Sequence, residues 1–290
     1  MKRNTTLLTF KEMSANLTTL IAFIGFVILF LSIGRFAASK AKSTESDYLL
    51  GSRSFGPWMV GLSAAATANS GFIMIAAVGF GYTNGISALW MAISFFIGEI
   101  IFWTFFPDKI NKSAGEHNAH TVPEFIGSVQ KKRSYLPATS LAALITVIFV
   151  GAYACGQLAS AAKTLDVFFG LDAKWGIIIT AIIILSYCFK GGLRASIWTD
   201  FVQAIIMLIT TVSAALVVLI TVGGPIAGLE ALAAIDPKLT DFFSMFDGFS
   251  GGVLYVVAFA FLGFGFDFSQ PHLLIRLFAG KDPKNCKKCP

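Results

Sequence analysis

Residues 61–72 read GLSAAATANSGF and lie inside a charge-free interval that runs from residue 54 to residue 98. The interval is long enough for two helices, because about 20 residues span a hydrocarbon core of about 30 Å. The polar turn YTNG at residues 82–85 divides it. Small and polar residues are thus concentrated in the middle of the first of these helices, at residues 66–71, where a membrane helix is normally apolar.

A second irregular segment, residues 263–272, reads GFGFDFSQPH. Its glycines loosen a helix, Asp267 places an acid in an apolar span, and Pro271 lacks the backbone N–H donor. The two irregular segments fall in the second and seventh expected crossings, five helices apart. That separation is typical of the first members of two inverted repeats, whose discontinuous helices form the binding site of many secondary transporters.

Both segments also have simpler interpretations. Small residues in membrane helices often serve close packing, and serine hydroxyls can bond back to their own helix. Asp267 can cap the helix that restarts at Pro271, which would take an N1-type position. Glu99, the other acid in an expected span, is close enough to the end of its helix to snorkel.

The composition excludes a soluble globular domain. Of 290 residues, 56% are hydrophobic and 13% are charged, with a mean hydropathy of +0.74. We expect an all-α integral membrane protein with about seven crossings. The remaining spans are expected at residues 13–34, 134–162 and 175–189, from Phe201 onward and from Gly248 onward.

The distribution of Lys and Arg predicts the orientation. With the N-terminus outside and the C-terminus inside, sixteen of the 22 basic residues fall in inner loops. The six on the outer side are Lys2, Arg3, Lys11, Lys163, Lys174 and Lys238. The net charge of +6 is then explained by topology and anionic lipid headgroups, without a nucleic-acid partner. We expect a multi-pass protein of the cytoplasmic membrane. The sequence does not indicate an oligomeric state.

The sequence does not predict an enzyme. No nucleophile paired with a base, no metal cluster and no phosphate-binding loop is present. Cys286 and Cys289 form a lone CxxC, which is half of a zinc site at best.

Several motifs, in order along the chain, resemble the sodium:solute symporter family, and within it the sodium/proline symporters. They are YLLGSRSFGP at residues 48–57, Ser70-Gly71, the stretch from Gly191-Gly192 to Gln203, and QPH at residues 270–272 with Arg276. The resemblance implies an inverted-repeat, leucine-transporter-like fold. It also implies sodium-coupled symport of a small organic solute, such as proline or a related metabolite, with the sodium ion as cofactor.

The resemblance also implies roles for individual residues. Sodium is expected at the backbone of Ala66 and Asn69 and at Ser70, and coupling at Arg53 and Asp200. The predicted substrate-binding residues are Ser70, Gly71, Phe72, Tyr153, Phe264, Asp267, Gln270 and Pro271. The chain departs from the family where Ala68 replaces an acid and where the aromatic pattern around Asp267 differs. As a hypothesis, Asp267 supplies the anionic group that Ala68 lacks, near the cation or facing a substrate ammonium.

We expect residues 1–290 to be the N-terminal portion of one symporter domain, truncated to about seven helices. It would comprise an extra helix at about 13–36, a first repeat at about 55–223, the start of a second repeat at about 248–276 and an atypical tail at 282–290. Such a portion is not expected to transport alone. The alternatives are the membrane sensor domain of a symporter-like signalling protein and a non-functional fragment.

Overall fold

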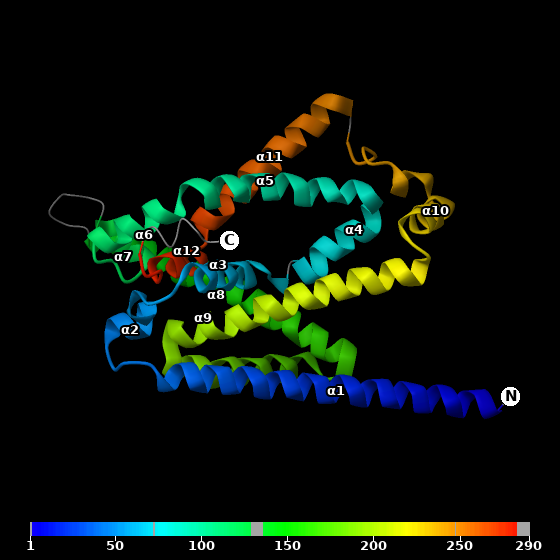
Figure 1. The fold of residues 1–290 in the computed structure, drawn as a ribbon, viewed down its shortest axis with the longest axis horizontal. Coiled ribbons are helices and arrows are strands. Elements are labelled where there is room, and N and C mark those ends of the chain that lie inside the picture. The colour runs from blue at the N-terminus through cyan, green and yellow to red at the C-terminus, as the bar shows by residue number, and fades with distance from the viewer. Residues whose placement is uncertain (1, 72, 129–135, 247, 283–290) are drawn as a thin grey trace.

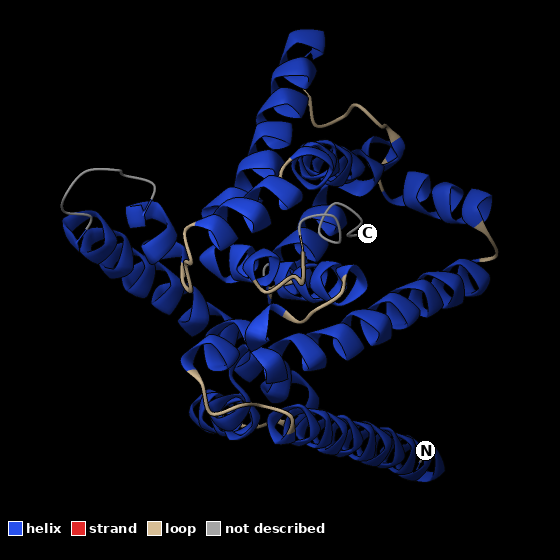
Figure 2. Cartoon of the chain, turned by 60° about the vertical axis from the view of Figure 1, so that its left-hand side comes forward, coloured by secondary structure: helices blue, strands red, loops and turns tan. Residues whose placement is uncertain are grey.

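The structure is a computed structural model that describes residues 2–71, 73–128, 136–246 and 248–282 (Figure 1). The described part consists of helices joined by loops (Figure 2), with one isolated parallel bridge between Phe55 and Gly280. The elements are α1 (Lys2–Ser39), α2 (Glu45–Leu50), η1 (Gly51–Arg53), α3 (Pro57–Ala68), the π-helix η2 (Ile73–Ala77), α4 (Val78–Asn84), η3 (Gly85–Ala88), α5 (Leu89–Phe105), α6 (Pro107–Glu116), α7 (Val122–Ser128), α8 (Leu136–Phe169), α9 (Ala173–Val222), α10 (Pro225–Ile235), η4 (Pro237–Thr240), α11 (Gly248–Ser269) and α12 (Pro271–Phe278).

Five helical stretches of the described part are long and apolar enough to cross a membrane, by length and composition. Large apolar side chains cover their outer surfaces; Val147 and Phe261, for example, are each 71% exposed. An apolar surface of this kind suits contact with lipid and not with water. The five stretches are Leu17–Ser39, Ile75–Phe105, Leu136–Phe169, Ala173–Val222 and Gly248–Ser269.

Two of the expected crossings are joined within the 50-residue α9, which turns at Gly192 with φ 52° and ψ −145°. A Cβ atom at this position would overlap the carbonyl oxygen of Tyr48, so glycine is required there. Figure 1 shows the chain reversing direction at the turn. The second arm begins directly after Gly192 and not at Phe201 as expected, because the charged residues Arg194 and Asp200 are paired and continue the helix.

The short elements between the long helices are segregated by position. The labels α2, α6, α7 and α12 lie at one end of the long helices, whereas the N-terminus and α10 lie at the opposite end (Figure 1). The first group includes the segments in which the sequence concentrates basic residues.

A buried core holds the elements of the first end together. Asn111 of α6 donates from Nδ2 to the carbonyl oxygens of Leu277, in the last turn of α12, at 2.6 Å and of Gly280, just beyond that helix, at 3.0 Å. The core residues are Leu50, Phe55, Val60, Phe102, Ala114, Ala119, Val122, Ile197, Leu274, Leu277, Phe278 and Ala279. This packing fixes α12 against α3 and α6, and thereby positions the site.

Candidate functional site

The second crossing is interrupted where the sequence predicts it. Helix α3 ends at Ala68, and Asn69 follows with an extended backbone, φ −72° and ψ 93°. Both the backbone N–H and the side-chain amide of Asn69 donate to the Ala65 carbonyl, at 3.2 and 3.0 Å. The chain resumes as the π-helix η2 at Ile73. Asn69 and Ser70 therefore lie at a break between helical segments, as predicted, and Ala66 lies in the last turn of α3 before it.

Helix α8 packs directly against this break. The Gly71 N–H donates to the side-chain oxygen of Gln157 at 2.8 Å. A Cβ atom at position 71 would overlap Ser160, so the close approach of the two segments depends on glycine. The role of Gln157 was not predicted from the sequence, because an amide inside an apolar helix shows no partner until the fold is known.

The seventh crossing is interrupted in the same manner. Helix α11 ends at Ser269, Gln270 is extended with φ −104° and ψ 96°, and α12 restarts with Pro271 at its first position. The ring of His272 stacks on Tyr153 of α8, with centroids 5.0 Å apart and an interplanar angle of 26°. Tyr153 lies four residues before Gln157, on the same face of α8. One face of α8 therefore contacts both interrupted helices.

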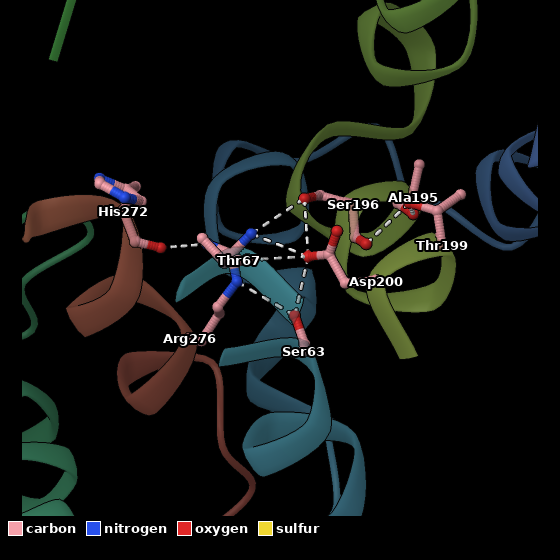
Figure 3. A network of polar contacts seen from close by, with 8 residues as sticks. All are labelled: Ser63, Thr67, Ala195, Ser196, Thr199, Asp200, His272 and Arg276. Carbon is pink, nitrogen blue, oxygen red and sulfur yellow. Dashed lines mark hydrogen bonds and ion pairs between the residues drawn. The ribbon is translucent and has the colours of Figure 1, made fainter. Parts of the chain in front are cut away.

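A polar network around one ion pair joins α3, α9 and α12 (Figure 3). Nη2 of Arg276, on α12, donates to Oδ2 of Asp200, on the second arm of α9, at 2.8 Å. The two side chains are 7% and 15% exposed. Ser63 of α3 connects them, since its hydroxyl donates to Asp200 at 2.9 Å and accepts from Nε of Arg276 at 3.0 Å.

Further hydrogen bonds extend this network towards the break in the second crossing. The hydroxyl of Thr67, one residue before the end of α3, donates to Asp200 at 3.4 Å. Ser196 donates to the same carboxylate at 3.2 Å, and Arg276 also donates to the His272 carbonyl. The predicted coupling residue Asp200 is thus linked both to the last turn of α3 and to the first turn of α12.

The second predicted coupling residue, Arg53, lies apart from this network. Its guanidinium donates to the carbonyls of Ala114 at 3.2 Å and Ala119 at 3.0 Å, which joins η1 to the end of α6. Burial lowers the pKa of Arg53. Through these contacts Arg53 helps to hold together the short elements at the end of the molecule that carries α2, α6, α7 and α12.

An additional ion pair, which the sequence did not predict, fixes α2 to the turn of α9. Arg194 pairs with Asp47 and also donates to the Gly51 carbonyl at 2.9 Å. Burial acts to raise the pKa of Asp47, but hydrogen bonds from Arg194, Ser52 and the Lys42 N–H outweigh it, and the pKa falls to about 2. The Tyr48–Pro57 motif is thereby anchored to the Gly191-Gly192 motif.

Two of the predicted substrate-binding residues, Phe264 and Asp267, lie towards α5 and not towards α8. Phe264 packs on Phe106 with ring centroids 5.6 Å apart, and Asp267 is buried beside Glu99 of α5. The structure thus brings Gly71, Tyr153 and the Gln270-Pro271 break together around α8, with Phe264 and Asp267 on the α5 side of α11. Phe72 lies outside the described residues.

Comparison with known proteins assigns these features to a family. A sequence model of the sodium:solute symporter family matches residues 48–289. The chain belongs to this family. The segments that meet in the structure all lie within the matched residues: the Tyr48–Pro57 stretch with the Gly191-Gly192 turn, and the interrupted second and seventh crossings with α8.

Individual relatives agree with this assignment. The chain is 31% identical over 264 residues to the osmoregulated proline transporter OpuE of Bacillus subtilis, covering 90% of this chain and 52% of that protein. It is also 31% identical over 277 residues to sodium/proline symporter 2 of Staphylococcus saprophyticus, covering 94% and 52%. The chain spans about half the length of these curated relatives.

A solved structure shares the fold. A Na+-coupled sialic acid symporter, in a substrate-bound outward-open state, superposes with a TM-score of 0.76 at 18% identity, over 92% of this chain and 55% of that one. The match confirms the expected fold class of an all-helical secondary transporter.

Proposed function

We propose that this chain contributes to a sodium-coupled symporter that carries a small organic solute across the cytoplasmic membrane. The observation that carries the proposal is the meeting of two interrupted helices on one face of α8, through Gly71–Gln157 and His272–Tyr153. Interrupted helices expose backbone polar groups that can bind an ion or solute where lipid cannot reach. Nothing in this arrangement calls for enzymatic chemistry.

We place the sodium ion at the break in the second crossing, on the backbone of Ala66 and Asn69 and on Ser70. A desolvated sodium ion requires several oxygen ligands, and a chain that leaves the helix at Asn69 can supply peptide carbonyls. The chain spans about half the length of its relatives. The remaining sodium ligands would come from the part of such a symporter that residues 1–290 do not cover.

The solute would bind next to the ion, against α8. Ser70, Gly71, Tyr153, Gln270 and Pro271 are the contacts that we propose, because the structure collects their segments around one helix face. Phe72 and Phe264 complete the set that we propose. Asp267, which the sequence predicts with them, is buried on the α5 side of α11. The names of the relatives favour proline or a related amino acid as the solute.

Coupling would run through the Asp200–Arg276 network, with Arg53 stabilising the inner loops. The network connects the last turn of α3 with the first turn of α12, so a movement at either break changes the geometry at the other.

We assign the end that carries α2, α6 and α7 to the cytoplasm, with the N-terminus outside. Residues 13–36 would be an extra helix, 55–223 the first repeat and 248–276 the start of the second.

The test uses proteoliposomes that hold the complete gene product. Uptake of labelled proline and related amino acids is measured with an inward sodium gradient and with choline in place of sodium. We expect uptake of at least one solute that requires sodium. Equal uptake in the two salts by a folded, inserted protein would contradict the proposal.

A further inference from the structure

Helices α5 and α11 cross with their backbones in direct contact. A Cβ atom at Gly98 would overlap the Ala260 carbonyl oxygen, and one at Gly263 would overlap the Phe95 carbonyl oxygen. Figure 1 shows the two helices crossing. The residues that follow in each helix bring two carboxyl groups, Glu99 and Asp267, to this crossing. Helices held this closely leave the two acids little freedom to separate.

Asp267 is buried in apolar surroundings. Its side chain is 2% exposed, and its Oδ2 atom accepts no hydrogen bond from any described residue. Trp103 is the donor that faces the carboxyl group. The flanking residues of α11 are aromatic and pack on α5: the rings of Phe102 and Phe268 are 4.8 Å apart, and those of Phe95 and Phe266 are 5.5 Å apart.

The charged groups nearby do not neutralise Asp267. From α5, Glu99 acts on it electrostatically with the same sign of charge. From α12, Arg276 is bound to Asp200, and His272 is stacked on Tyr153. In the described part of the chain, α5 thus places the acid Glu99 near Asp267. The basic side chain of α12, Arg276, is bound to Asp200 instead.

A proton is the occupant that fits this environment. Two ionised carboxylates in an apolar site repel each other, and burial penalises each charge. A sodium ion would need several oxygen ligands, whereas the side chains that flank Asp267 on α11 or face it from α5 include phenyl rings and an indole. A proton needs only the two carboxyl groups, one protonated and one ionised. We propose that Asp267 and Glu99 form a proton-binding site at the α5–α11 crossing, separate from the sodium site.

Infrared spectroscopy of the purified 290-residue chain tests this site, because a protonated carboxyl group has its own C=O stretching band. At neutral pH we expect such a band in the wild type and its loss in Asp267→Asn. Asp166→Asn, at an exposed position of α8, is the matched control and should keep the band. In Glu99→Gln the repelling charge is removed, so the band should disappear at a lower pH than in the wild type.

Circular dichroism establishes whether each variant folds. If Asp267→Asn does not fold, the Glu99→Gln titration decides the proposal by itself. The proposal fails if the wild type shows no protonated carboxyl band at neutral pH, or if the Glu99→Gln band titrates as the wild-type band does. It also fails if replacing choline chloride by sodium chloride abolishes the band, since the site would then take sodium.

Discussion

Arg276 and Asp200, separated by 76 positions in the chain, form a buried ion pair at 2.8 Å that joins α12 to α9. Ser63 of α3 bonds to both partners. Helix α3, which ends at the first break, and α12, which begins at the second, are therefore fixed to one polar centre. Such a centre can transmit a change at one break to the other, provided that its partners stay together.

Breaking this ion pair should destabilise the protein. Asp200→Asn or Arg276→Gln leaves a buried charge without its partner, and we expect each to lower the free energy of unfolding by about 3 kcal/mol. Denaturant unfolding in detergent measures the loss. Asp166→Asn, an exposed acid, should change stability by less than about 0.5 kcal/mol. The double variant should recover part of the loss; strictly additive effects would show that the two residues are not coupled.

Gly71→Ala should abolish sodium-dependent uptake by the complete gene product. The added methyl group would overlap Ser160 and separate the break from α8. Gly79→Ala places a methyl group in open space on α4 and should transport normally. Ser160→Gly removes the obstructing side chain, so the Gly71→Ala/Ser160→Gly variant should regain activity. A fully active Gly71→Ala protein would show that this contact is not needed.

The α5–α11 crossing can be tested with glycine substitutions on one helix. Gly263→Ala would overlap the Phe95 carbonyl, and we expect it to destabilise the protein by about 2 kcal/mol or more. Gly265→Ala, two residues along the same helix, meets nothing within 4 Å and should be neutral or slightly stabilising. Thermal unfolding compares the two. Equal melting temperatures would mean that the helices do not cross at these glycines.

The Asp47–Arg194 ion pair predicts a pH dependence of stability. The pKa of Asp47 falls from 3.8 to about 2 on folding, so its contribution of about 2 kcal/mol is present above pH 3.8 and is lost as pH falls towards 2. Asp47→Asn should therefore be less stable than the wild type at neutral pH, and the difference should shrink in acid. A difference that is constant from neutral pH to pH 2 would exclude this ion pair as its source.

The sequence was sufficient to predict the fold class and the position of both helix breaks. Charge-free intervals mark the spans, and small residues at 66–71 and Pro271 mark the interruptions. The separation of two spans between residues 189 and 201 was predicted as well. The start of the second arm of α9 was predicted wrongly, at Phe201, because an apolar interval does not show that Arg194 and Asp200 will be paired and carried inside the helix.

The partners across the site could not be predicted in the same way. Gln157 and Ser63 are ordinary polar residues in apolar helices, and their roles depend on which helix faces them. The neighbour of Asp267 on α5 could not be predicted for the same reason, since Glu99 is 168 positions away in the chain. Periodicity locates residues on a helix, but only the packed structure identifies the neighbour.

In the proposed function, sodium and a small solute move together through this site. The most direct measurement is the entry of radioactive sodium into proteoliposomes that hold the complete gene product, with and without the transported solute outside. We predict that the solute accelerates sodium entry and that Asp200→Asn abolishes the acceleration. Solute uptake that proceeds without any solute-dependent entry of sodium would contradict coupled transport.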